Sequence, residues 1–137
     1  MMKKRIQSTI ALIAAIGLTA TTQAADPAEP ELIGVMFYAD SCGSCKILDP
    51  KIKKVQANYL SKPLLFATFD HSNDASKNQA ALLAGSLDLG EVYKAQEKAS
   101  GFMLVIDAET KKVVTKLTKD MTEEQIKEAL DQALSQA

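Results

Sequence analysis

Residues 35–46 of the chain read Val35-Met36-Phe37-Tyr38-Ala39-Asp40-Ser41-Cys42-Gly43-Ser44-Cys45-Lys46. An apolar run ends in two polar residues, and the only two cysteines of the chain follow. The next residues carry a helical apolar stripe made of Leu48, Ile52, Val55 and Tyr59. A strand that runs directly into C-x-x-C at a helix start brings two sulfurs within bonding distance. It also places the first sulfur at the positive end of the helix. The stretch therefore predicts a thiol–disulfide redox site.

A purely structural disulfide is the competing interpretation of Cys42 and Cys45. The two residues are three positions apart, so a bond between them closes a very small loop. The entropic effect of a disulfide grows with the length of the loop that it closes. A stabilising role alone is therefore disfavoured.

The first 25 residues have the layout of a secretory signal peptide. Met1–Arg5 is basic, Ile10–Ala20 is a short apolar run, and small or polar residues follow. The run is shorter than the about 20 apolar residues that a membrane-spanning helix needs. We expect cleavage after Ala24 or Ala25 and a periplasmic or secreted protein. Its cysteines would then lie in an oxidising compartment.

The charge of the mature chain argues against a nucleic-acid partner. Removal of the basic N-terminus lowers the positive charges from 16 to 13 against 17 negative ones, and it removes the only arginine. Phosphate-binding surfaces usually need a basic face with arginine side chains. Residues 26–31 are expected to form an extended leader, and residues 32–137 a single domain.

Strand and helix patterns alternate along this domain. The apolar runs predict strands at Leu32–Ala39, Leu64–Phe69, Phe102–Ile106 and Val113–Leu117. Helices are predicted from Cys42 to the Ser61-Lys62-Pro63 sequence, over Ala75–Leu87, over Gly90–Lys98, and after a capping box at Thr122–Gln125. Pro50 lies inside the first helix, which is expected to kink or restart there. The order implies parallel pairing of the first two strands and a C-terminal hairpin.

This order, with C-x-x-C at the first strand–helix junction, resembles the thioredoxin-like family. The resemblance is closest over Phe37–Lys46 and includes Pro50, at the position of the family's helix-kinking proline. It implies an α/β three-layer sandwich, with a mixed four-stranded sheet and helices on both faces. It also implies a thiol–disulfide oxidoreductase that needs no cofactor and acts on protein thiols or disulfides. A membrane electron donor and a monomeric state are further expectations.

The resemblance assigns roles to the motif residues. Cys42 is expected to be the nucleophile, with a pKa lowered by the helix N-terminus, and Cys45 the resolving thiol. Gly43 allows the tight turn, and the charge of Lys46 favours the Cys42 thiolate. Ser44 either donates a hydrogen bond to the Cys42 sulfur or is an ordinary first-turn residue.

Three positions depart from the family pattern. Met36 replaces a buried acidic residue, and Ser41 replaces a tryptophan. The segment Lys98-Ala99-Ser100-Gly101-Phe102 lacks the proline that the family places opposite the cysteines. Near Ser100, Gly101 either takes up the tight backbone or meets an ordinary turn requirement. These departures weigh against broad protein disulfide reduction.

The alternative function is a non-catalytic module that binds copper or a partner protein through the same cysteine face. His71 would then join Cys42 and Cys45 as a metal ligand, and Met36, Met103 and Met121 are possible soft ligands. We favour an exposed turn histidine and core methionines instead. Asp40 is either a nearby acid or base, or a polar strand end.

Overall fold

The computed structural model describes residues 29–137. The strands are β1 (Leu32–Tyr38), β2 (Leu64–Asp70), β3 (Phe102–Asp107) and β4 (Val113–Thr118). The helices are α1 (Gly43–Gln56), followed by the 3₁₀ turn η1 (Ala57–Tyr59), and α2 (Asp74–Ser86), α3 (Gly90–Ala95) and α4 (Glu123–Gln136). Within this range no helix is both long and apolar enough to cross a membrane.

The strands form one sheet in the order β2-β1-β3-β4. β1 pairs with β2 in parallel and with β3 antiparallel, and β3 and β4 form an antiparallel hairpin. The sequence Leu-Ile-Gly-Val-Met-Phe of β1 is buried throughout, as expected for a central strand covered on both faces. In this register, Phe37 lies beside Phe69 on β2 and Phe102 on β3.

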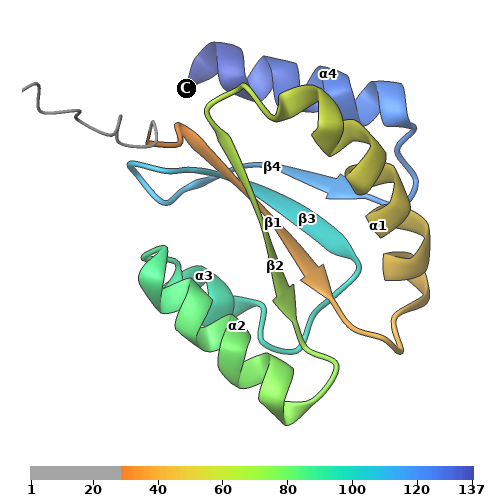
Figure 1. Cartoon of the computed structure of the whole chain (residues 1–137), viewed down its shortest axis with the longest axis vertical. Helices are drawn as coiled ribbons and strands as arrows, with labels where there is room; N and C mark the ends of the chain where they lie inside the picture. Colours follow the sequence, from red (N-terminus) through yellow and green to blue (C-terminus); the bar gives the residue numbers. More distant parts are fainter. Residues whose placement is uncertain (1–28) are drawn as a thin grey trace, which may run out of the picture.

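Helices cover both faces of the sheet, as Figure 1 shows, with α1 and α4 on one side and α2 and α3 on the other. Alternate residues of β1 point into two separate cores. Leu32 and Met36 pack under the buried α1 residues Leu48, Ile52 and Val55 and the α4 residues Ile126 and Leu130. Ile33, Val35 and Phe37 pack with Ala80 and Ala84 of α2. The predicted three-layer α/β sandwich is confirmed.

Helix α1 continues through Pro50, which is exposed. The predicted restart of the helix is therefore wrong. Proline lacks the N–H that would bond to the Lys46 carbonyl one turn earlier. The ring lies on the solvent side of α1, while Leu48 and Ile52 hold the helix to the core. Burial on both sides of Pro50 thus keeps the helix in one piece.

The capping box predicted at the C-terminal end is also confirmed. The Thr122 hydroxyl accepts from the Gln125 amide at 3.2 Å, and the Gln125 side chain accepts from the Thr122 amide at 2.9 Å, which makes a capping box for α4. Lys51 of α1 donates to the carbonyls of Lys119 and Met121, at 2.7 and 2.8 Å, just before that cap. These bonds fasten α1 to the start of α4. The predicted signal peptide and residues 26–28 of the leader lie outside the described residues.

Candidate functional site: a disulfide at the N-terminus of α1

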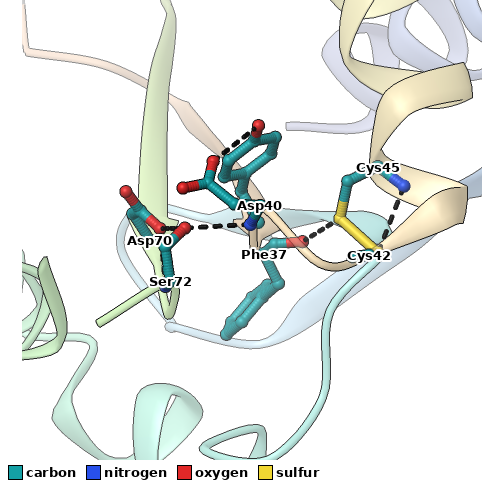
Figure 2. The surroundings of a disulfide bond; sticks show 7 residues. Phe37, Asp40, Cys42, Cys45, Asp70 and Ser72 are labelled. Carbon is teal, nitrogen blue, oxygen red and sulfur yellow. Dashed lines mark hydrogen bonds between the residues drawn. A yellow bond between two sulfur atoms is a disulfide. The ribbon is translucent and has the colours of Figure 1, made fainter. Parts of the chain in front are cut away.

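Cys42 and Cys45 form a disulfide between the C-terminal end of β1 and the first turn of α1, drawn in Figure 2. Their Cα atoms lie 5.3 Å apart. The Cys42 amide donates to the Ala39 carbonyl at 3.0 Å, which closes the short turn after β1. Cys42 is partly exposed, whereas Cys45 is fully buried in the core between α1 and the sheet. One sulfur is therefore open to a partner molecule and the other is protected.

The Cys42 sulfur occupies the N-cap position of α1. It accepts a hydrogen bond from the Cys45 amide at 3.2 Å, in the way that a serine or aspartate oxygen caps other helices. The first turn of α1 holds no acidic side chain to offset the positive end of the helix. A backbone N–H and the positive end of a helix are surroundings that generally favour a thiolate over a thiol. This hydrogen bond comes from the backbone, and the Ser44 hydroxyl makes none in the described part of the chain.

The Phe37 carbonyl lies beneath the buried sulfur, 3.6 Å from Cys45 Sγ. In the disulfide this sulfur carries no proton, so the approach is a contact. After reduction the Cys45 thiol has this carbonyl as its acceptor. The same carbonyl accepts from the Gly101 amide at 2.8 Å. One backbone oxygen of β1 thus contacts both Cys45 and the segment that leads into β3.

Gly101 lies against the open side of the disulfide. Its φ is +93°, in the left-handed region that favours glycine. A Cβ at this position would lie 2.8 Å from the Ser44 Cβ and 3.1 Å from the Cys42 Sγ. All peptide bonds of residues 29–137 are trans, including the one after Ser100. Gly101 therefore meets both expectations, since it takes up a tight approach and a positive φ at once.

The space behind the disulfide is apolar. Met36 and Met103 are 2% and 1% exposed, and they pack with Cys45 in the core under α1. No charged side chain is buried among residues 29–137. Both methionines are thus core residues, and Met121 packs on the edge of the same core.

A polar network ties the end of β1 to the end of β2, as Figure 2 shows. The Asp40 amide donates to the Ser72 hydroxyl at 2.9 Å, and that hydroxyl donates to Asp70. Tyr38 donates its hydroxyl to the Asp40 carboxylate at 3.2 Å, and this bond raises the pKa of Tyr38. Asp40 therefore behaves as a strand-end anchor that holds the loop before Cys42.

His71 departs from its expected place as an exposed turn residue. Its ring packs edge-on between Phe37 and Tyr93, with ring centroids 6.0 and 5.4 Å away. Its Nε2 atom is buried, with no hydrogen-bond partner in the described part of the chain. The residue is half-buried because α3 brings Tyr93 over it. The prediction of an exposed histidine was wrong.

The metal alternative with Cys42, Cys45 and His71 as ligands is also not borne out by the geometry. Within residues 29–137, no three or more histidine, cysteine or acidic side chains are grouped to hold a metal ion. Lys46 points to solvent on α1. Of the residues singled out from the sequence, the structure brings together Cys42, Ser44, Cys45 and Gly101.

Three contributors to the site were not identified from the sequence. The Phe37 carbonyl is backbone, which no residue pattern marks as an acceptor. Ser72 reaches Asp40 across 32 positions, and Tyr93 reaches His71 from a separate helix. The polar cluster Asp70–Asp74 indicated only a turn in the sequence. Pairing of Tyr38 with Asp70 brings the ends of β1 and β2 together, and the bonds from Ser72 to Asp70 place its hydroxyl near Asp40.

Comparison with known proteins agrees with this arrangement. The family model described as thioredoxin matches residues 21–85, which include β1, the cysteine pair, α1, β2 and most of α2. The crystal structure of StoA from Bacillus subtilis is similar to this chain with a TM-score of 0.52 at 18% sequence identity. The similarity covers 76% of this chain and 85% of StoA, and at that identity it shows the fold. No curated protein matches the sequence.

Proposed function

We propose that this chain, which has a thioredoxin-like fold with a disulfide at the N-terminus of α1, is an exported thiol–disulfide oxidoreductase acting on protein substrates. The observation that carries the proposal is the asymmetry of the cysteine pair. Cys42 is partly exposed and capped by a backbone N–H, while Cys45 is fully buried three residues later. Thiol–disulfide exchange needs an accessible thiolate as the attacking sulfur, and a second thiol nearby in the same protein can resolve the mixed disulfide.

In the reducing direction, the Cys42 thiolate attacks one sulfur of a substrate disulfide. A mixed disulfide forms, and the first substrate sulfur leaves as a thiolate that takes up a proton from water. Cys45 then loses its proton and attacks Cys42 Sγ, which releases the second substrate sulfur. The substrate gains two electrons, and the protein is left with the Cys42–Cys45 disulfide. The oxidising direction runs through the same mixed disulfide in reverse.

The carbonyl of Phe37 and the apolar side chain of Met36 affect how readily Cys45 loses its proton in the second step, the attack on the mixed disulfide. The reduced Cys45 thiol has the Phe37 carbonyl as its hydrogen-bond acceptor, and no buried carboxylate in the described chain is available to remove its proton. Water that enters beside Cys42 is then the base. We therefore expect resolution of the mixed disulfide to be slower than its formation near neutral pH.

Capture of a mixed disulfide tests this function. We expect the Cys42→Ser variant to form no adduct with a disulfide-containing peptide, and the Cys45→Ser variant to accumulate one that mass spectrometry detects. The matched control carries Cys42→Ser, Cys45→Ser and Ser135→Cys, which places one exposed thiol at the far end of α4. Equal adduct formation by this control and by Cys45→Ser would sink the enzymatic proposal.

Export is the second part of the proposal, and the basic, apolar and small-residue order of the first 25 residues supports it. We expect the mature chain to begin at Ala25 or Asp26. N-terminal sequencing of the protein recovered from the extracytoplasmic fraction checks this. A chain recovered only from the cytoplasm, with Met1 or Met2 at its start, would contradict it.

A further inference from the structure

We propose that two copies of this chain associate edge to edge through β2, with the two strands antiparallel and Ala67 of each copy at the two-fold axis. The inference goes beyond the proposed exchange activity and does not depend on it. It differs from the monomeric state that the family resemblance implied. It rests on the open edge of β2, on the exposed apolar side chains around that edge, and on the charges at its ends.

The outer edge of β2 carries none of the usual protection against pairing with another strand. Among residues 29–137, β2 has β1 as its only strand neighbour, so it forms one edge of the sheet (Figure 1). Its sequence, Leu-Leu-Phe-Ala-Thr-Phe-Asp, contains no lysine and no proline, and its pairing with β1 runs without a register shift from Leu64 to Asp70. Edge strands of soluble proteins commonly carry charges, prolines or bulges that block a further strand. The terminal Asp70 is the only charge on β2.

The opposite edge of the sheet, β4, is protected in both ways. Lys116 lies within β4, and Lys112 directly precedes it. The pairing of β4 with β3 also contains a register shift at Val105/Ile106. Two β4 strands side by side would bring lysines of both copies together, and like charges across a strand pair are destabilising. Of the two edges, only β2 is suited to a second copy of the chain.

The backbone of β2 presents hydrogen-bonding groups to this open edge. The Pro63 carbonyl accepts from the Leu32 amide at 3.1 Å, and the His71 amide donates to a carbonyl at the end of β1 at 2.7 Å. Backbone N–H and C=O groups alternate in direction along a strand, so the odd-numbered residues of β2 face β1. Phe66 and Thr68 therefore direct their N–H and C=O groups away from β1. Pro63 faces β1, so its missing N–H removes no donor from the open edge.

Antiparallel pairing about Ala67 uses the whole strand. Phe66 then lies opposite the partner's Thr68, and Leu64 lies opposite the partner's Asp70. Both pairs consist of residues whose backbone groups face outward, so each pair can exchange two N–H···O bonds. The small side chain of Ala67 meets its own copy at the axis. An isologous contact of this kind repeats every interaction twice.

Exposed apolar side chains gather around the same edge. Leu65 of β2 is 38% exposed, and Leu60, shortly before the strand, is 81% exposed. Leu82 and Leu83 are exposed on α2, the helix that packs on β2. Contiguous exposed apolar groups on a soluble protein mark interaction surfaces. A second copy would remove part of this surface from water.

The opposite face of β2 and the charges at its ends also fit a second copy. A hollow between α1 and β2 is lined by Asp49, Phe66 and Thr68, among other residues. The partner's Phe66, opposite Thr68, lies at the mouth of this hollow. Lys62 precedes β2 by two residues, which makes it a diagonal neighbour of the partner's Asp70. Opposite charges on such neighbours attract.

Sedimentation velocity of the oxidised protein tests the association. Between about 1 μM and about 1 mM we expect a monomer–dimer equilibrium, with a dissociation constant that Thr68→Lys raises about tenfold or more. The matched control Val114→Lys adds the same charge at an exposed position of β4 and should leave the constant unchanged. A wild-type protein that stays monomeric throughout overturns the proposal and leaves the edge to a strand of another protein. Equal effects of the two variants overturn it as well.

Cross-linking tests the register. In the Cys42→Ser, Cys45→Ser background, Ala67→Cys places two thiols directly opposite each other, where Cβ atoms lie about 4.5–5.5 Å apart. We expect mild oxidation to convert this variant into a covalent dimer. Leu65→Cys is the matched control, because its two thiols would lie about 13 Å apart along the strands. Equal cross-linking of the two variants, or none in Ala67→Cys, overturns the pairing.

The proposed dimer leaves both disulfides accessible. Cys42 follows the C-terminal end of β1, which runs parallel to β2, so antiparallel β2 strands place the two disulfides at opposite ends of the dimer. We expect Thr68→Lys to form mixed disulfides at the wild-type rate. Failure of the association is therefore distinguishable from failure of the proposed exchange activity.

Discussion

Position 101 tolerates no side chain, because two constraints meet there. The φ of +93° is unfavourable for any residue with a Cβ, and a Cβ would press on Ser44 and on the Cys42 sulfur. The backbone of Gly101 thus lies so near Ser44 and the Cys42 sulfur that no room is left for a Cβ atom. The segment achieves this with trans peptide bonds and without a proline.

We expect Gly101→Ala to lower the free energy of unfolding by about 1–3 kcal/mol. It should also slow the reaction of Cys42, because the new methyl group displaces or covers the sulfur. Urea unfolding and the rate of mixed-disulfide formation measure the two effects. Gly85→Ala on α2 is the matched control, since a Cβ there meets nothing within 4 Å, and we expect no loss of stability from it. Equal stability of the two variants would contradict the argument.

Two lysines of α1 contact the region of α4, and their contacts differ in burial and in type. α1 carries the cysteines, and its buried stripe packs against the sheet and α4. Lys51 adds two hydrogen bonds to backbone carbonyls before α4. Lys54 makes only a surface ion pair with Glu123, at 3.1 Å, and its side chain is 71% exposed. The two lysines lie on the same helix and reach the same neighbour, so they form a matched pair.

We expect Lys51→Met to cost about 1–3 kcal/mol, because it leaves two part-buried carbonyls without donors. Lys54→Met should cost about 0–1 kcal/mol, since exposed ion pairs contribute little. Chemical denaturation of both variants at the same salt concentration checks the difference. Comparable losses would show that charge, and not carbonyl pairing, joins α1 to α4.

At the scale of the whole molecule, two groups near the end of β2 make stability depend on pH. Burial lowers the pKa of His71. Burial would raise the pKa of Asp70, but hydrogen bonds from the hydroxyl and amide of Ser72, together with smaller effects of Ser76 and His71, outweigh it and leave that pKa below its usual value. In both cases the unfolded chain binds its proton at a higher pH than the folded one, so acid favours unfolding.

We therefore expect the free energy of unfolding to fall in two stages on acidification. The first begins below about pH 6.5 as the unfolded chain protonates His71, and the second below about pH 4 as it protonates Asp70. Urea unfolding at a series of pH values measures the curve. His71→Phe should remove the first stage and leave the second. Persistence of the first stage in this variant would assign it to another group.

The strand and helix boundaries followed from the sequence because they depend on local periodicity. β1 was predicted as Leu32–Ala39 and found at Leu32–Tyr38, and the capping box at Thr122 began α4 as expected. The restart of the helix at Pro50 and the exposed position of His71 were the predictions that failed. Burial on either side of Pro50 outweighed its missing hydrogen bond, and aromatic residues from β1 and α3 enclosed His71.

The sequence by itself determined the order of the elements, the two-sided burial of β1 and the place of Cys42 and Cys45 at the first strand–helix junction. These are properties of neighbouring residues and of the period at which apolar side chains recur. Only the tertiary structure decided that Gly101 lies beside the Cys42 sulfur and that the Phe37 carbonyl lies beneath Cys45. It also decided that the His71 ring packs against the ring of Phe37. Such contacts depend on the sheet register, which determines which residues of β2 and β3 lie beside each residue of β1. A shift of the register by one residue would turn every side chain of a strand to the other face.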